Sequence, residues 1–272
     1  MNKQVICAYF SGTGTTKKTV EKIGEALSEK LNLPCSSWDF TLPAARKEVK
    51  SFGEDDIVIF GTPVIAGRVP NVLLKFLETI QGGNAIGIPI VCFGNRAFDD
   101  GLIELKDILE NSQMRIVAAG GFPCEHSFSR ILGQGRPDED DLIILNLFAE
   151  MISKKILAGN VSGTIEVSGT PKPYSGYYTP RDREGNPVDI RKVTPVTDME
   201  KCVDCKICAN LCPLGSIDFE DVSKMTGICM KCCACIKGCP LGAKNFTDKN
   251  YLYHQYELEE GYKRRGNASL FV

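Results

Sequence analysis

The most constraining feature of this sequence is a cysteine pattern that occurs twice within residues 198–249. Each copy reads C-x2-C-x2-C-x3-C-P, and the second copy begins 27 positions after the first. The chain holds 13 cysteines, and nine of them lie between residues 202 and 239. So dense a group of thiols, in a chain whose first residues do not read as a signal peptide, predicts metal ligands rather than disulfide bonds.

The spacing within each copy is that of ligands to a [4Fe–4S] cluster. Three cysteines separated by two residues can wrap a tight loop around three iron corners of a cubane. The fourth corner faces away, so the last cysteine of each copy serves the other cluster. We therefore expect two clusters, held by two sets of thiols. The first thiol set is Cys202, Cys205, Cys208 and Cys239, and the second thiol set is Cys229, Cys232, Cys235 and Cys212.

Zinc is the alternative metal, because it also binds pairs of cysteines in C-x2-C spacing. Eight thiolates in two runs that each end in Cys-Pro favour iron–sulfur clusters over zinc. Cys233 is left over once each cluster has four ligands. We expect it to be a buried residue that binds no iron.

Residues 198–249 resemble the two-cluster ferredoxins of bacteria, which implies a small α+β domain and one-electron transfer at low potential. The segment holds seven acidic and seven basic side chains. A free ferredoxin is usually strongly acidic, and this acidity steers it to basic partners. A balanced charge suits a module that is tethered to its own redox partner domain.

Residues 1–158 alternate short apolar segments with longer helical ones, which predicts a doubly wound α/β domain with a parallel sheet. The predicted strands are rich in Val and Ile, as burial on both faces requires. We place the strands at residues 4–10, 34–40, 56–61, 88–93 and 115–121, and the helices at 16–31, 71–80, 99–111 and 138–157.

The loop after the first predicted strand reads SGTGTTKK and opens a helix. It lacks the third glycine of a dinucleotide fingerprint and the GK[ST] of a P-loop. Its hydroxyls and backbone N–H groups, at the positive end of a helix, can hold a phosphate without a salt bridge. The candidate residues are Ser11, Gly12, Thr13, Gly14, Thr15 and Thr16.

This loop resembles the flavodoxin phosphate loop, [S/T]-x-T-G-x-T, and the domain therefore resembles the flavodoxins, with a five-stranded doubly wound sheet. The resemblance implies FMN at the carboxyl ends of the strands. It also implies that two further loops approach the flavin ring. The first holds Gly61, Thr62, Pro63, Val64, Ile65, Ala66, Gly67 and Arg68, and the second holds Gly94, Asn95, Arg96, Ala97, Phe98 and Asp99.

The two loops depart from the flavodoxin pattern in their aromatic residues. Many flavodoxins stack one aromatic side chain from each loop on the flavin, but here Phe98 is the only candidate. One flavin face is then either open or covered by a tyrosine of the linker, residues 159–197. His126 either faces this site or is an ordinary loop histidine. We interpret Cys7, Cys35, Cys92 and Cys124 as small core residues.

Residues 159–197 are rich in Gly and Pro and show no periodicity, which predicts an extended linker. Tyr174, Tyr177 and Tyr178 within it indicate that the linker packs on something. A linker of this length also suggests a homodimer, in which the ferredoxin module reaches a neighbour's flavin. The tail, residues 250–272, is polar, and its sequence indicates no role.

The net charge is −2, which implies no general attraction to nucleic acid or to an anionic membrane. No apolar run is long enough to span a bilayer, and we expect a cytoplasmic protein.

The whole chain resembles the flavodoxin–ferredoxin fusion proteins of anaerobic bacteria and archaea. The resemblance implies an electron relay between the clusters and FMN, with a redox partner protein. A reductase that binds an organic or nicotinamide substrate at an open flavin face is the alternative. A redox sensor is a third reading, and no DNA-binding motif supports it.

Overall fold

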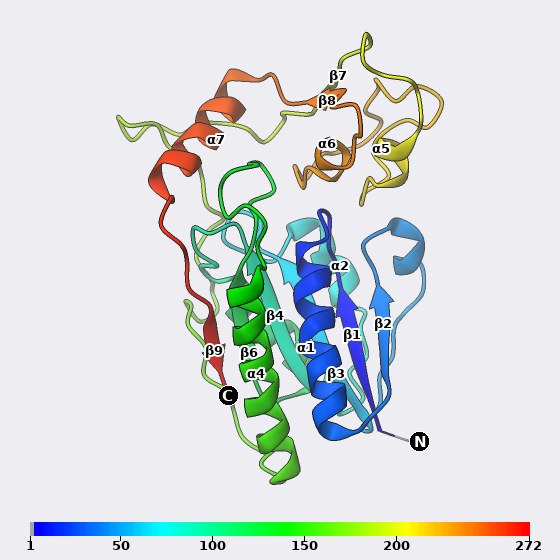
Figure 1. Cartoon of the computed structure of the whole chain (residues 1–272), viewed down its shortest axis with the longest axis vertical. Coiled ribbons are helices and arrows are strands. Elements are labelled where there is room, and N and C mark those ends of the chain that lie inside the picture. The colour runs from blue at the N-terminus through cyan, green and yellow to red at the C-terminus, as the bar shows by residue number, and fades with distance from the viewer. Residues whose placement is uncertain (1–2) are drawn as a thin grey trace.

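The computed structural model describes residues 3–272, so the first two residues of the predicted N-terminal domain lie outside the described residues. Figure 1 shows a larger α/β domain with a smaller module above one end of its sheet. The module holds the cysteine repeat. The linker and the tail both run between the two parts, so the chain crosses from one to the other more than once.

The larger domain is built on a sheet in the order β2-β1-β3-β4-β6-β9, with β5 also paired to β4. Neighbouring strands are parallel except β6 and β9, which are antiparallel. If β9 is set aside, and β5 and β6 are counted together as the fifth strand, the strand order is the flavodoxin-like 2-1-3-4-5. The predicted fold class is therefore confirmed. The strands are β1 (Gln4–Tyr9), β2 (Cys35–Asp39), β3 (Asp56–Pro63), β4 (Ile86–Phe93), β5 (Arg115–Ile116), β6 (Ala119–Pro123) and β9 (Ser269–Phe271).

Helices cover both faces of this sheet (Figure 1). On one face, α1 (Thr15–Leu31) and α4 (Glu139–Leu157) bury apolar residues against β1, β3 and β4. On the other face lie α3 (Gly101–Asn111), η2 (Asn71–Leu73) and α2 (Leu74–Leu77), while η1 (Pro43–Arg46) follows β2. These two layers fix the carboxyl ends of β1, β3 and β4 at one edge, where the predicted flavin loops begin.

Two predicted elements differ from the structure. The helix expected at 71–80 forms only η2 and α2, because after Leu77 the chain tightens into turns in which Thr79 N donates to Phe76 O at 3.0 Å and Ile80 N donates to Leu77 O at 3.2 Å. The fifth strand is split into β5 and β6, since only residues 115–116 and 119–123 pair as strands. The predicted sheet also lacked β9, which adds an antiparallel edge strand from the far end of the chain.

Cys7, Cys92 and Cys124 are at most 3% exposed, in agreement with the interpretation as core residues. Cys35 is exposed, and for this residue the interpretation is wrong. It begins β2, the edge strand of the sheet, whose residues are mostly uncovered. Cys35 is therefore exposed because its strand lies at the edge of the sheet, although its side chain is small and apolar.

The linker packs on the larger domain rather than hanging free. The Asp100 carboxylate accepts hydrogen bonds from Thr170 N at 2.8 Å and Ser175 N at 2.7 Å. Tyr174 Oη donates to Asp107 at 2.7 Å. Because Asp100 and Asp107 lie at α3, the linker is held along this helix before it reaches the cysteine-rich module.

The tail has a structural role that its sequence did not indicate. It forms α7 (Lys249–Gly261) beside the cysteine-rich module and then descends to place β9 on the edge strand β6 (Figure 1). The Asn95 amide donates to Tyr262 O at 2.7 Å and to Arg264 O at 2.9 Å, and its oxygen accepts from Gly266 N at 2.9 Å. The tail is thereby fastened to one of the two predicted flavin loops.

We expect Asn95→Ala to destabilise the protein and free the tail. Asn95 is 5% exposed, and its loss leaves partly buried backbone groups of the tail without their partner, at a cost of about 1–3 kcal/mol. Thermal unfolding and limited proteolysis after residue 261 measure the two effects. Asn146→Ala is the matched control, because Asn146 is exposed and bonds only within α4. Equal melting temperatures for wild type and Asn95→Ala would contradict this role.

Candidate functional site

The two copies of the cysteine pattern have the same backbone course. Each forms a loop, a short helix and a turn, and β7 (Val196–Thr197) pairs with β8 (Lys244–Asn245) to close the module. The helices are α5 (Ile207–Asn210) and α6 (Ala234–Lys237). β7 lies inside the predicted linker, so the module starts before residue 198. Residues with a positive φ angle recur 27 positions apart in the two copies. They are Asp204 and Lys231, Lys206 and Cys233, and Gly215 and Gly242.

The structure brings the eight predicted ligands together as the two predicted sets. One hollow is lined by the second thiol set, including Cys212 from the other copy. A second hollow is lined by the first thiol set, including Cys239. Within residues 3–272, no three His, Cys, Asp or Glu side chains stand close enough to hold a single metal ion. Four thiols that surround a hollow can hold a cluster, because each thiol then binds a different iron of that cluster.

Backbone N–H groups point at the two crossing cysteines in the same way. Ser216 N lies 3.2 Å from Cys212 Sγ, and Ala243 N lies 3.2 Å from Cys239 Sγ. Burial alone would raise the pKa of Cys239, but the N–H groups of Ala243 and its neighbours outweigh it and lower the pKa. Burial raises the pKa of Cys232 and of Cys235 to about 12, so without a metal these thiols are protonated near pH 7.

Cys233 occupies the position that Lys206 holds in the first copy, at the start of a short helix. It borders the hollow of the second thiol set, but its Sγ lies 3.4 Å from Tyr251 Oη and 3.6 Å from Lys231 O. The residue is 3% exposed. This placement agrees with the expectation of a buried cysteine outside the ligand sets.

The phosphate loop joins β1 to α1, and no side chain of residues 3–272 caps the N-terminus of this helix. Gly14, at φ 87°, occupies the N-cap, and neither a capping side chain nor an acidic residue stands in the first turn. Ser11 Oγ accepts a hydrogen bond from Lys17 N at 3.0 Å, which closes the loop. Thr16 is 1% exposed and lies against the Cys92 thiol. The remaining N–H groups of the first turn suit an anion.

At this end of the sheet, Thr62 carries a buried hydroxyl without a hydrogen-bond partner among the described residues. It lies near the end of β3, next to Gly61, which pairs with Tyr9 just before the phosphate loop. Its side chain is completely buried, and within residues 3–272 its Oγ1 is the one such side-chain N or O atom without a hydrogen-bond partner. Because an unpaired buried hydroxyl costs free energy, this atom fits a site that a bound phosphate oxygen completes.

The two predicted flavin loops lie against each other. A Cβ atom added to Gly67 would lie 2.6 Å from Asp99 Oδ2, and Asp100 N donates to Gly67 O at 3.0 Å. Phe98 packs inward, with its ring centroid 5.6 Å from that of Phe93, and it contacts Gly121 of β6. The loops themselves therefore present no outward aromatic ring.

A linker tyrosine lies across these loops instead. Tyr178 N donates to Ala66 O of the first loop at 2.8 Å. The Arg96 guanidinium of the second loop lies 4.4 Å from the centroid of the Tyr178 ring. Arg68 has other partners, because it pairs with Glu104 and lies between Tyr174 and Tyr177.

Both histidines of the chain also gather near the second loop. The His126 ring covers Gly94 so closely that a Cβ atom added there would lie 2.1 Å from His126 Cδ2. The His254 ring of α7 lies 6.1 Å from the Tyr178 ring. Burial, together with the charges of His254, Lys237 and Arg96, lowers the pKa of His126 to about 3, so this ring is neutral near pH 7.

The second thiol set meets the phosphate loop directly. A Cβ atom added to Gly12 would lie 3.0 Å from Cys232 Cβ and 3.4 Å from Cys232 Sγ. Lys237 holds the contact by donating to Glu125 Oε1 at 2.5 Å and to His126 O at 2.8 Å. The structure therefore places a predicted cluster ligand against a predicted flavin-binding loop of the same chain.

Comparisons with known proteins match each part separately. The family model of the 4Fe-4S binding domain matches residues 195–218. The larger domain has the flavodoxin strand order. The chain joins a flavodoxin-like domain to a 4Fe-4S binding domain. These findings support an iron–sulfur flavoprotein of electron transfer that holds at least one [4Fe–4S] cluster.

Solved structures similar to this chain cover its flavodoxin-like domain. A flavodoxin from the domain Archaea is 19% identical, with 57% of this chain and 99% of that chain covered and a TM-score of 0.40. The FMN-bound flavodoxin of Fusobacterium nucleatum is 17% identical, with 58% and 99% covered and a TM-score of 0.37. An oxidoreductase from Corynebacterium diphtheriae is 13% identical, with 58% and 99% covered and a TM-score of 0.43. Comparison with curated proteins gave no match.

Some features of the site were not predicted from the sequence. The linker tyrosines indicated packing, and a linker tyrosine was one alternative for covering a flavin face, but the sequence did not single out Tyr178 or indicate that α7 brings His254 near the loops. Asn95, predicted to contact the flavin, directs its side-chain amide to the tail.

Within residues 3–272, no helix is long and apolar enough to cross a membrane.

Proposed function

We propose that this chain is an electron-transfer protein in which two [4Fe–4S] clusters exchange electrons with one FMN. The observation that carries the proposal is the contact between Cys232 and Gly12. It puts a cluster ligand beside the loop that would hold the flavin phosphate. Flavin accepts one or two electrons whereas each cluster carries one, so the flavin can connect one-electron and two-electron chemistry.

The cluster held by the second thiol set is then the inner one, next to the flavin. The cluster of the first thiol set is the outer one, where a partner protein exchanges electrons. Cys205 of this set is exposed. Around it Val203 is 68% exposed, Leu241 48% and Ile207 37%, which leaves an apolar rim for a docking protein.

The flavin would be held by residues from three loops and covered by other parts of the chain. Ser11, Thr13 and Thr62 offer hydroxyls to the phosphate, together with the N–H groups at the start of α1. Tyr178 and His254 lie over the loops that would flank the ring. A covered ring favours electron exchange with the clusters over reduction of a free substrate.

We expect Thr62→Val to weaken FMN binding while leaving the flavin-free protein as stable or more stable. Valine has the shape of threonine but removes the buried hydroxyl that has no partner in the chain. A hydrogen bond to a charged phosphate contributes about 1.5–3 kcal/mol, so FMN affinity should fall by roughly 10-fold to 150-fold. Fluorescence titration of flavin-depleted protein measures the affinity, and thermal unfolding measures the stability.

Thr41→Val is the matched control, because Thr41 is also buried but its Oγ1 already accepts from Ser11 N at 2.8 Å. This variant should lose stability in the flavin-free protein. An unchanged FMN affinity in Thr62→Val would mean that the phosphate lies elsewhere.

A further inference from the structure

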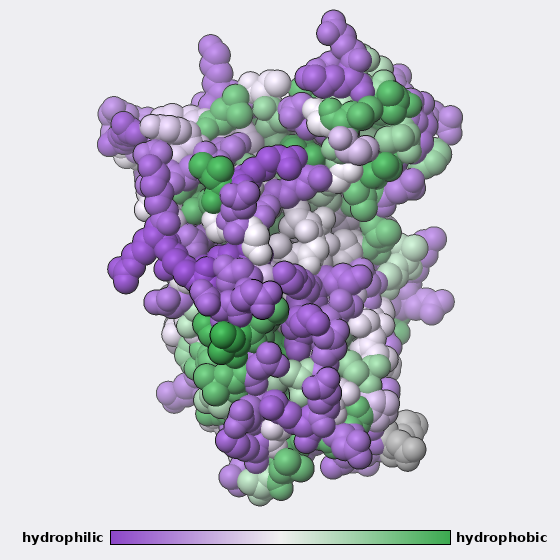
Figure 2. All heavy atoms as spheres, in the orientation of Figure 1, coloured by the Kyte–Doolittle hydropathy of each residue, from purple (hydrophilic) through white to green (hydrophobic). Residues whose placement is uncertain are grey.

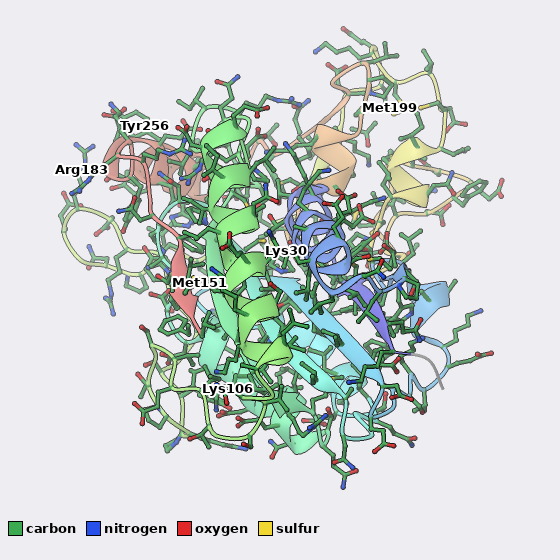
Figure 3. The ribbon with its side chains drawn as sticks, turned by 60° about the horizontal axis from the view of Figure 1, so that its bottom comes forward. Lys30, Lys106, Met151, Arg183, Met199 and Tyr256 are labelled. Carbon is green, nitrogen blue, oxygen red and sulfur yellow. The ribbon has the colours of Figure 1, made fainter. Side chains whose placement is uncertain are left out.

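Helix α4 carries an exposed stripe that no other element of the chain covers among the described residues. Ile143 is 69% exposed, Leu147 is 51% exposed and Met151 is 38% exposed. They are four residues apart and therefore lie along one side of the helix. Figure 2 shows apolar surface in the lower half of the molecule, and Figure 3 shows Met151 on α4 at the front.

Charged residues extend this stripe at both ends. Asp140 lies three residues before Ile143, and Lys154 lies three residues after Met151. At 100° per residue, all five side chains fall within about 40° of the direction of Leu147. The stripe is thus acidic at its N-terminal end, apolar in the middle and basic at its C-terminal end.

The order of residues in the stripe is symmetric about Leu147. Two copies of α4 packed antiparallel on a two-fold axis would place Leu147 against its own copy. Ile143 would face Met151 of the other copy, and Asp140 would face Lys154. Every apolar residue then meets an apolar residue, and each acid meets a base, as an isologous contact requires.

We propose that the exposed face of α4 is the interface of a homodimer, with the two helices antiparallel and crossing at a shallow angle. A shallow crossing, about 20°, keeps the ends of the helices close enough for the Asp140–Lys154 pairs. In the single chain Lys154 pairs with Glu150, at 73% side-chain exposure, and Asp140 has no salt-bridge partner among the described residues. The dimer gives Asp140 a partner without breaking the pairs within the chain.

This contact differs from exchange of the ferredoxin module between protomers. The module already lies against the phosphate loop of its own chain, through Cys232 and Gly12. Helix α4 belongs to the larger domain, where it lies beside α1 and below the cysteine-rich module (Figure 1). A dimer through α4 would therefore leave each relay intact, and one helix from each protomer would form its centre. We expect a reversible dimer whose fraction rises with protein concentration.

Sedimentation velocity of the anaerobically purified full chain, over a concentration series, tests the proposal. Leu147→Glu brings two like charges together at the two-fold axis and should raise the dimer dissociation constant by at least about tenfold. Leu157→Glu is the matched control, because Leu157 is 71% exposed on the same helix but lies outside the stripe. It should leave the dissociation constant unchanged, and circular dichroism should show both variants folded.

A charge exchange tests the pairing itself. Asp140→Lys should weaken the dimer because it places two bases opposite each other. Adding Lys154→Asp to the same chain restores an acid opposite each base and should recover most of the affinity. Three results would overturn the proposal: a monomer at every concentration, a dimer that Leu147→Glu leaves unchanged, or a double variant no tighter than Asp140→Lys alone.

Discussion

Cys239→Ser is expected to remove about half of the iron from the chain, whereas Cys233→Ser keeps all of it. Two clusters bring about eight irons and eight sulfides per chain, about four of each per cluster. Cys239 lines the hollow of the first thiol set although it belongs to the second copy of the pattern. Its loss should therefore damage the cluster held by Cys202, Cys205 and Cys208. Cys233 directs its thiol to Tyr251 and should be dispensable for both clusters.

Iron and sulfide analysis after anaerobic purification measures this prediction. Cys212→Ser is the matched comparison, because Cys212 is the crossing residue of the other copy and lines the hollow of the second thiol set. It should also remove about half of the iron, but from the inner cluster. If Cys233→Ser lost as much iron as Cys239→Ser, the assignment of ligands would be wrong.

Cys229→Ala is expected to slow reduction of the flavin by a one-electron donor while the outer cluster is still reduced rapidly. Without the inner cluster, electrons must cross a longer gap from the first thiol set to the flavin, which should lower the rate about tenfold or more. Cys202→Ala changes the equivalent residue of the other copy, 27 positions earlier. It should slow reduction of the inner cluster and the flavin together, because it removes the entry point.

Anaerobic stopped-flow spectroscopy with a reduced ferredoxin as the donor follows the clusters and the flavin separately. Point variants serve better than removal of residues 198–272, because that deletion also removes β9 and the tail that Asn95 holds. NADH or NADPH alone should reduce the flavin slowly in every variant. Fast reduction by either nucleotide would favour the reductase, and a wild-type flavin rate in Cys229→Ala would contradict the relay.

Much of the candidate site could be predicted because its signals are local in sequence. The ligand sets follow from the spacing of cysteines within a few residues, which the geometry of a cubane dictates. The phosphate loop follows from hydroxyls and glycine at the start of a helix. The strands and helices of the flavodoxin-like domain follow from apolar segments long enough to be buried. The helix predicted at 71–80 is shorter in the structure, because the chain turns at Thr79 and Ile80, and Gln81 then bonds to Lys50, which is distant in the sequence.

The sequence by itself determined the two chemistries, iron–sulfur ligation and a flavodoxin-like phosphate loop, and the order in which the chain presents them. Only the tertiary structure decided how the two parts meet. Packing brings Cys232 against Gly12, lays Tyr178 across both flavin loops and binds the Asn95 side chain to the tail. These contacts join residues far apart in the chain. No local pattern encodes them, because each depends on the shapes of two surfaces that exist only after folding.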